Sequence, residues 1–88
     1  MRIDKFLKVA RLIKRRTLAK EICERGQVTL NSRVAKAGAE VKPGDLITIN
    51  FGHRRLTVEV VELRANAPAK TAAELYRVRE DRQITPPP

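Results

Sequence analysis

The residues of this chain best suited to chemistry are basic side chains gathered near its start. Between residues 2 and 20, eight basic residues minus one acidic residue give +7 of the chain's formal net charge of +9. The basic residues are Arg2, Lys5, Lys8, Arg11, Lys14, Arg15, Arg16 and Lys20, and the acid is Asp4. Arginine can fork onto a phosphate, and lysine acts on it as a point charge. The cluster therefore predicts a surface for a polyanion, with nucleic acid ahead of an anionic membrane surface.

The sequence contains no group of residues with the types and spacing that catalysis or metal binding requires. His53 is the sole histidine and has no cysteine or carboxylate near it at ligand spacing. Cys23 is the sole cysteine, so it can form neither an internal disulfide nor a metal site with a second cysteine. No phosphate-cradling glycine loop and no nucleophile-and-base set is present. We expect a protein that is not an enzyme and needs no cofactor.

A first helix is expected to carry the start of the basic cluster. Its apolar side chains recur at i, i+3, i+4 and i+7, which predicts a stripe packed on a core: Ile3, Phe6, Leu7 and Ala10. Asp4, Lys8, Arg11 and Arg15 recur on another face, which should point outward. Asp4 also precedes Lys8 by four residues, which predicts an ion pair of about 0.2–0.5 kcal/mol. Two roles for Asp4 stay open: orienting basic side chains, or contacting a base or sugar hydroxyl directly.

The rest of the chain predicts a second helix and a small antiparallel sheet. A helix capped by Thr17 or a residue just before it should run to Gly26, with an apolar face of Leu18, Ala19, Ile22 and Cys23. Strands are predicted over residues 27–30, 46–51 and 56–63, with a tight reversal at Asn31-Ser32. Residues 42–45, Lys-Pro-Gly-Asp, predict a type II turn. Arg54 and Arg55, at a hairpin tip, either extend the positive surface or keep the hairpin soluble.

These elements predict one small α+β domain over residues 1–64. Residues 65–78 should form a linker and a short helix, residues 71–76, that packs back on the domain. The charged and then proline-rich segment 79–88 is expected to be a mobile tail. The charged start and the absence of a long apolar run predict a cytoplasmic protein that is not inserted in a membrane.

Several short motifs in order give the first half of the chain a resemblance to a known family. They are Arg2-Ile3-Asp4-Lys5-Phe6-Leu7, Arg15-Arg16-Thr17-Leu18-Ala19, Gly26-Gln27-Val28-Thr29-Leu30-Asn31, Lys36, and Val41-Lys42-Pro43-Gly44-Asp45-Leu46-Ile47. Over about residues 1–50 the chain resembles the RNA-binding domain named after ribosomal protein S four. The resemblance implies the αL fold, in which two helices pack on a small sheet and grip structured RNA.

A wider resemblance covers nearly the whole chain, through residues 11–20 and the segment Ala72-Ala73-Glu74-Leu75-Tyr76. It is to the RqcP family of small ribosome-associated proteins, which are relatives of the heat-shock ribosome-associated protein. This resemblance implies a factor of ribosome-associated quality control that binds large-subunit rRNA and peptidyl-tRNA on obstructed large ribosomal subunits. It further implies that, with the partner RqcH, the factor supports C-terminal alanine tailing of stalled chains. A cytoplasmic, ribosome-associated monomer is expected.

The family's RNA-facing positions match Arg2, Asp4, Arg11, Arg15 and Arg16 here. Further candidates are Lys5, Lys8, Lys14, Lys20, Asn31 and Lys36. Two positions depart from the family pattern, since Asn31-Ser32 replaces an Asn-Gly turn and Ala37 replaces a proline.

The alternative function is a general structured-RNA or DNA-binding module, since two helices joined by a basic elbow, residues 11–16, resemble a helix-turn-helix. Against DNA reading, residues 17–25 contain Glu21 and Glu24 and lack a row of base-reading side chains.

Overall fold

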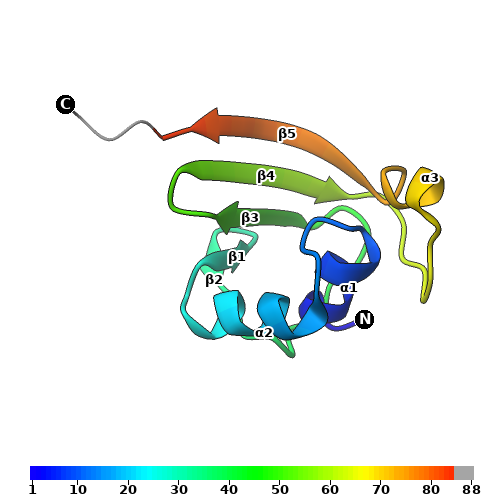
Figure 1. Cartoon of the computed structure of the whole chain (residues 1–88), viewed down its shortest axis with the longest axis horizontal. Coiled ribbons are helices and arrows are strands. Elements are labelled where there is room, and N and C mark those ends of the chain that lie inside the picture. Colours follow the sequence, from blue (N-terminus) through cyan, green and yellow to red (C-terminus); the bar gives the residue numbers. More distant parts are fainter. Residues whose placement is uncertain (85–88) are drawn as a thin grey trace.

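Two helices pack on one face of a five-stranded antiparallel sheet in the computed structural model, which describes residues 1–84 (Figure 1). The elements, in chain order, are α1 (Ile3–Val9), α2 (Arg16–Glu24), β1 (Val28–Leu30), β2 (Arg33–Val34), β3 (Leu46–Asn50), β4 (Arg54–Val60), α3 (Ala69–Ala72) and β5 (Tyr76–Gln83). The strand order across the sheet is β2-β1-β3-β4-β5. Both helices lie beside the β1–β3 half, away from β5. The predicted α+β class is confirmed.

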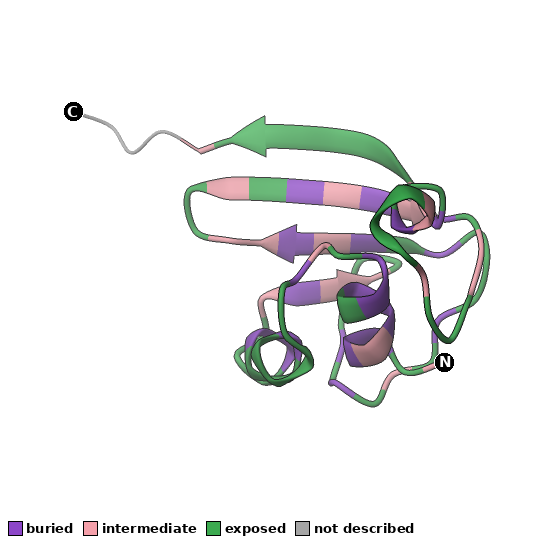
Figure 2. Cartoon of the chain, turned by 45° about the vertical axis from the view of Figure 1, so that its right-hand side comes forward, coloured by how far each residue is buried: buried purple, intermediate pink, exposed green. Residues whose placement is uncertain are grey.

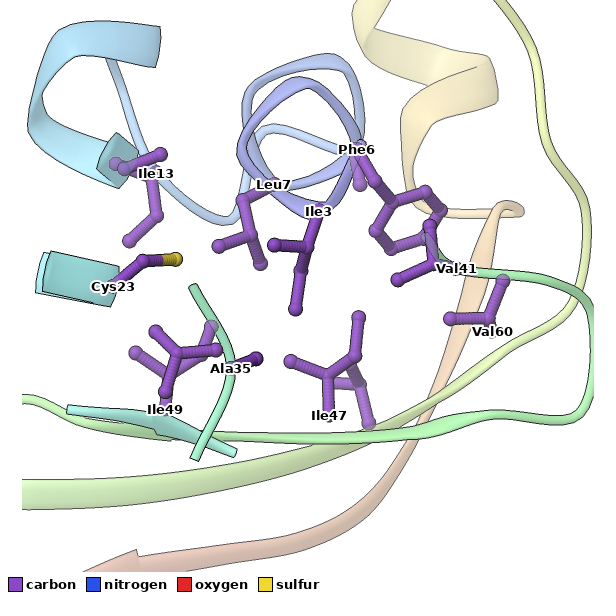
Figure 3. Close-up of a cluster of buried hydrophobic side chains, with 14 of the residues drawn as sticks. Ile3, Phe6, Leu7, Ile13, Cys23, Ala35, Val41, Ile47, Ile49 and Val60 are labelled. Carbon is purple, nitrogen blue, oxygen red and sulfur yellow. The ribbon is translucent and has the colours of Figure 1, made fainter. Parts of the chain in front are cut away.

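The core lies between α1, α2 and the facing side of β3 and β4 (Figure 3). The predicted stripe of α1 is confirmed, because Ile3, Phe6 and Leu7 are fully buried and Ala10 is 1% exposed. Strand alternation supplies the other wall, with Ile47 and Ile49 on β3 and Leu56, Val58 and Val60 on β4. The prediction for Leu18 is wrong, since this α2 residue is 43% exposed. The facing elements do not reach that flank of the helix.

Both long helices end in the same backbone motif, with one residue in the left-handed region. After α2, Gly26 has φ +75°, and the N–H groups of Gly26 and Gln27 donate to carbonyls of the last helical turn. After α1, Arg11 occupies the matching position with φ +59°. The pattern is a Schellman motif, in which glycine is preferred. Gly26 was predicted, whereas the left-handed Arg11 was not. The start of α2 also differs from prediction, because its N-cap is Arg15 without a side-chain cap, and Thr17 lies in the first turn.

The predicted reversal at Asn31-Ser32 joins β1 to β2 and is confirmed. Both residues have positive φ, +51° and +70°, as a type I′ hairpin turn requires. Asparagine tolerates this region, while serine is strained there. The predicted type II turn is also present, with Gly44 at φ +94° and Asp45 N–H donating to Lys42 O at 3.1 Å.

Replacing Ser32 with glycine is expected to stabilise the protein by about 1 kcal/mol. A left-handed residue costs about 1–3 kcal/mol, and glycine removes that strain while losing about 0.5–1 kcal/mol more backbone entropy on folding. Urea unfolding monitored by circular dichroism measures the difference. Ser32→Ala is the control, since it keeps the strain and should give no gain. An equal effect of the two substitutions would contradict the assignment of strain to this turn.

The C-terminal part of the chain differs most from prediction. The short helix is α3, which ends at Ala72, and not the predicted residues 71–76. The prediction of a mobile segment from Arg79 is wrong for residues 79–83, which belong to β5 and pair with β4. Residues 85–88 of that predicted tail lie outside the described residues. Strand β4 also begins two residues earlier than predicted and ends at Val60.

Strand β5 is held by backbone pairing and ion pairs more than by burial. Most of its side chains are exposed (Figure 2). Arg54 on β4 forms a two-pronged ion pair with Asp81, at 2.7 and 2.8 Å. The hydrogen bonds from Arg54 lower the pKa of Asp81. The Arg54 side chain therefore joins β4 to β5, whereas Arg55 beside it is exposed.

Among residues 1–84, none of the helices has the length and apolar character needed to cross a lipid bilayer.

Candidate nucleic-acid interface

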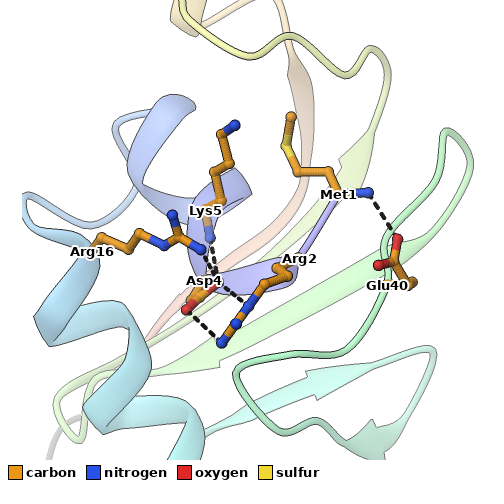
Figure 4. A network of polar contacts seen from close by, with 6 residues as sticks. All are labelled: Met1, Arg2, Asp4, Lys5, Arg16 and Glu40. Atoms are coloured by element: carbon orange, nitrogen blue, oxygen red, sulfur yellow. Dashed lines mark hydrogen bonds and ion pairs between the residues drawn. The ribbon is translucent and has the colours of Figure 1, made fainter.

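Asp4 lies on the first turn of α1, between Arg2 and Arg16 of the basic cluster (Figure 4). The residue is 2% exposed, and its carboxylate lies between two arginines. Asp4 Oδ1 is 3.3 Å from Arg2 Nε and 3.5 Å from a terminal guanidinium nitrogen of Arg16. Arg2 also donates to Asp4 Oδ2 at 3.3 Å. Oδ1 accepts the backbone N–H of Lys5 at 2.8 Å. Residues from two helices therefore converge on one buried carboxylate.

This arrangement fixes the two guanidinium groups while leaving them accessible. Their side chains are 49% and 48% exposed, so each keeps donors free for an external anion. A buried carboxylate is stable only when it is paired and hydrogen-bonded, which Arg2, Arg16 and the Lys5 N–H provide. One carboxylate between two arginines leaves a local charge of +1. The arrangement suits a phosphate, whose oxygens would occupy the remaining donors.

The prediction that Asp4 faces outward with Lys8 is wrong in both parts. Asp4 turns toward Arg2 and α2 and is buried, and its ion pairs within residues 1–84 are with Arg2 and Arg16. The physical reason is that α2 crosses the first turn of α1 and brings Arg16 to the carboxylate. An arginine from a second element and burial by that element outweigh a surface pair within one helix.

A backbone clasp holds the start of α1 in place. Ile3 N–H donates to Ala39 O at 2.8 Å, and Val41 N–H donates to Met1 O at 2.9 Å. The ammonium group of Met1 contacts Glu40 at 2.8 Å, as Figure 4 shows. These contacts fix the backbone that carries Arg2 and Asp4.

Some of the basic candidates line one of two hollows, whereas Lys5 and Arg15 line neither. A hollow of about 300 Å³ is lined by Arg2, Asp4, Arg16, Thr17 and Lys20. A groove of about 640 Å³ at the other end of α1 includes Lys8, Arg11 and Lys14 in its lining. Arg15 is exposed at the N-cap of α2. The side chain of Lys5 is half-buried.

Asn31 and Lys36 belong to neither hollow. The Asn31 side chain is engaged by the scaffold, since it donates to Asp45 at 3.1 Å and accepts Leu46 N–H at 2.9 Å. Lys36 lies 4.0 Å from Glu24 at an exposed position. RNA contact by either residue stays a prediction.

Sequence reasoning missed the convergence of Arg2 and Arg16 on Asp4. The two arginines are 14 positions apart, and no periodicity relates them across the elbow between the helices. It also missed Asn66 and Pro68, which line the larger groove from the linker. Neither residue carries a charge or a motif that would have marked it.

Cys23 takes no part in this surface. It is fully buried, and burial, reinforced by Asp4 and Glu24, raises the pKa of its thiol to about 11. The thiol therefore stays protonated near neutral pH and behaves as a small core residue, as predicted. Within residues 1–84 no three side chains from His, Cys, Asp or Glu are grouped so that they could hold a metal ion.

The fold agrees with what comparison to known proteins finds. The S4 domain family matches residues 1–47. A protein of Halalkalibacterium halodurans named RQC P-site tRNA stabilizing factor is 52% identical over 85 residues, which cover 97% of each chain. A protein of Bacillus subtilis with the same name is 48% identical, covering 96% of this chain and 98% of the relative.

A solved structure extends the likeness to the whole fold. The trimeric structure of heat shock protein 15 from Vibrio cholerae superposes with a TM-score of 0.83 at 35% identity, covering 89% of this chain and 80% of the other. The S-four-type fold expected from the sequence is confirmed. The chain therefore belongs to the S4 domain family and, within it, to the family of RQC P-site tRNA stabilizing factors.

Proposed function

We propose that this protein is a non-catalytic RNA-binding factor that stabilises tRNA on large ribosomal subunits during quality control of stalled translation. The observation that carries the proposal is the pair Arg2 and Arg16, held at the surface by the buried Asp4. A rigid pair of accessible guanidinium groups suits the phosphates of folded RNA. The relatives' name, RQC P-site tRNA stabilizing factor, supports tRNA as the bound RNA.

The finer parts of the proposal concern the binding partners. The protein binds large-subunit rRNA and peptidyl-tRNA together on the obstructed subunit, and with RqcH it supports C-terminal alanine tailing. It acts as a monomer in the cytoplasm, associated with ribosomes. Support for RNA as the ligand comes from the formal charge of +9, of which +7 lies within residues 2–20. Analytical ultracentrifugation of the free protein tests whether it is a monomer.

Replacing Arg16 with alanine is expected to weaken binding to large subunits that carry peptidyl-tRNA by about five- to tenfold. The substitution removes one phosphate contact from a half-exposed side chain, so the fold should persist. The slope of log affinity against log salt should also fall by about one unit, because one fewer counterion is released. Co-sedimentation with purified subunits at several salt concentrations measures both quantities.

Arg79→Ala is the matched control, since it removes an arginine that also contacts a carboxylate, Glu59 at 2.8 Å, but on β5. It should change affinity less than twofold. Equal losses for the two variants would mean that general charge, and not this site, drives binding. Equal affinity of the parent protein for duplex DNA would favour the general nucleic-acid module instead.

A further inference from the structure

A groove lies where α1, the elbow that follows it and the linker before α3 meet. Its volume is about 640 Å³, within the range of about 300–1,000 Å³ that small-molecule sites occupy. It shares no lining residue with the hollow around Asp4. Helix α1 has seven residues and so spans about 10 Å. The two hollows therefore lie near opposite ends of this helix.

Three cations line the groove without a carboxylate. Lys8, Arg11 and Lys14 are exposed, and none of them forms an ion pair within residues 1–84. Arg2 and Arg16 in the other hollow share Asp4, so the groove is the less compensated of the two sites. Like charges at one site repel, and the fold gains nothing from gathering them. Their placement points to an anionic ligand.

The backbone at Arg11 supports a functional role for this groove. Its φ of +59° places an arginine where a Schellman motif favours glycine. The motif is complete, with Arg11 N–H donating to Lys8 O at 3.0 Å and Leu12 N–H to Leu7 O at 3.0 Å. Residues held in strained backbone conformations cluster at ligand-binding positions, and the arginine here supplies a charge that glycine cannot. The strained backbone turns the elbow sharply and displays Arg11 at the groove.

The rest of the lining is apolar with one amide. Leu12, half-buried on the elbow, and Pro68, on the linker, provide flat aliphatic surface, and Asn66 provides a donor and an acceptor. A planar base packs on such a surface or on a guanidinium plane, and an amide can bond its edge. A paired base is enclosed in its helix and cannot enter a hollow of this kind.

From this geometry we infer that the groove holds one unpaired, unstacked nucleotide of the bound RNA. This inference rests on the RNA-binding function proposed above and adds to it the kind of nucleotide that is bound. The base lies against Leu12 and Pro68, Asn66 bonds its edge, and Lys8, Arg11 and Lys14 surround the phosphates on either side. The protein then recognises a looped-out nucleotide with the groove, in addition to the phosphate contacts at Arg2 and Arg16.

The first test introduces a carboxylate at two adjacent linker positions. Asn66→Glu places the carboxylate in the groove. Ala65→Glu places it at the adjacent position, which is exposed and does not line the groove. Both changes alter the long-range field equally, because the positions lie well within one Debye length. With purified large subunits carrying peptidyl-tRNA, Asn66→Glu should weaken binding at least tenfold and Ala65→Glu less than threefold. Equal effects would overturn the groove as a binding site.

The second test identifies the occupant by photocrosslinking from a benzophenone amino acid placed at Asn66. We expect a crosslink on the same subunits to an RNA nucleotide that is unpaired in the ribosomal RNA or tRNA. The same group at Thr48, in a polar hollow on the open face of the sheet, is the control and should give no such crosslink. A crosslink to a ribosomal protein, or only to base-paired nucleotides, overturns the inference.

If Arg16→Ala weakens binding while Asn66→Glu and Ala65→Glu act alike, the groove inference alone fails. If Arg16→Ala has no effect, the proposed function fails as well.

Discussion

Replacing Asp4 with asparagine is expected to weaken RNA binding about tenfold, even though it removes a negative charge from a basic surface. Simple electrostatics predicts the opposite sign, since RNA repels the carboxylate. The expectation follows from the geometry, because Asp4 is 2% exposed and its carboxylate oxygens contact Arg2, Arg16 and the Lys5 N–H. An amide holds the two guanidinium groups weakly, so they separate and lose their shared phosphate geometry. A tenfold loss corresponds to about 1.4 kcal/mol.

The matched control is Glu21→Gln, which also removes one carboxylate. Glu21 is exposed on α2 and forms no ion pair within residues 1–84, so its loss should leave RNA affinity unchanged or slightly increased. Titration of labelled large subunits at fixed salt measures both variants, and circular dichroism checks that each is folded. Binding by Asp4→Asn at or above the parent's affinity would show that Asp4 does not position the arginines.

The sequence predicted the elements whose signals are local. The spacing of Ile3, Phe6, Leu7 and Ala10 gave the buried face of α1, and Gly26 and Gly44 marked positions of positive φ that the structure contains. The basic cluster was visible for the same reason, since its residues lie close in the chain. Its organisation was not visible. Which cation meets Asp4 depends on how α2 crosses α1, and helix periodicity carries no information on that crossing.

Strand β5 shows most clearly which part of the fold the sequence alone could not predict. Its sequence, Tyr76–Gln83, contains charges of both signs and few apolar residues, which is typical of an exposed or unstructured segment. The strand forms because β4 offers an edge with free backbone groups, and seven pairs of residues match across it. Charged side chains on an exposed edge strand also discourage pairing with other chains. Composition therefore predicted a tail where long-range backbone pairing builds a strand.

The predicted domain boundary at residue 64 has a direct test in Leu75, the residue just before β5. Replacing Leu75 with alanine is expected to lower the free energy of unfolding by about 2–5 kcal/mol, because a fully buried leucine leaves a cavity in the main core. Domains of this size have a total stability of about 4–13 kcal/mol, at about 0.05–0.15 kcal/mol per residue. The loss is therefore a large fraction of the whole. Urea unfolding measures it, and the unfolding transition should remain single.

Val78→Ala is the control for Leu75→Ala, since it shortens an aliphatic side chain three residues later that is 51% exposed. Its cost should stay below about 1 kcal/mol, because little surface leaves water at this position. The contrast isolates core packing from any general sensitivity of the C-terminal segment. A loss below about 1 kcal/mol for Leu75→Ala would instead mean that residues 1–64 carry the stability by themselves. A large loss would mean that the platform for Arg2, Asp4 and Arg16 depends on the C-terminal segment, since Leu75 packs in the same core as Ile3, Phe6 and Leu7 of α1.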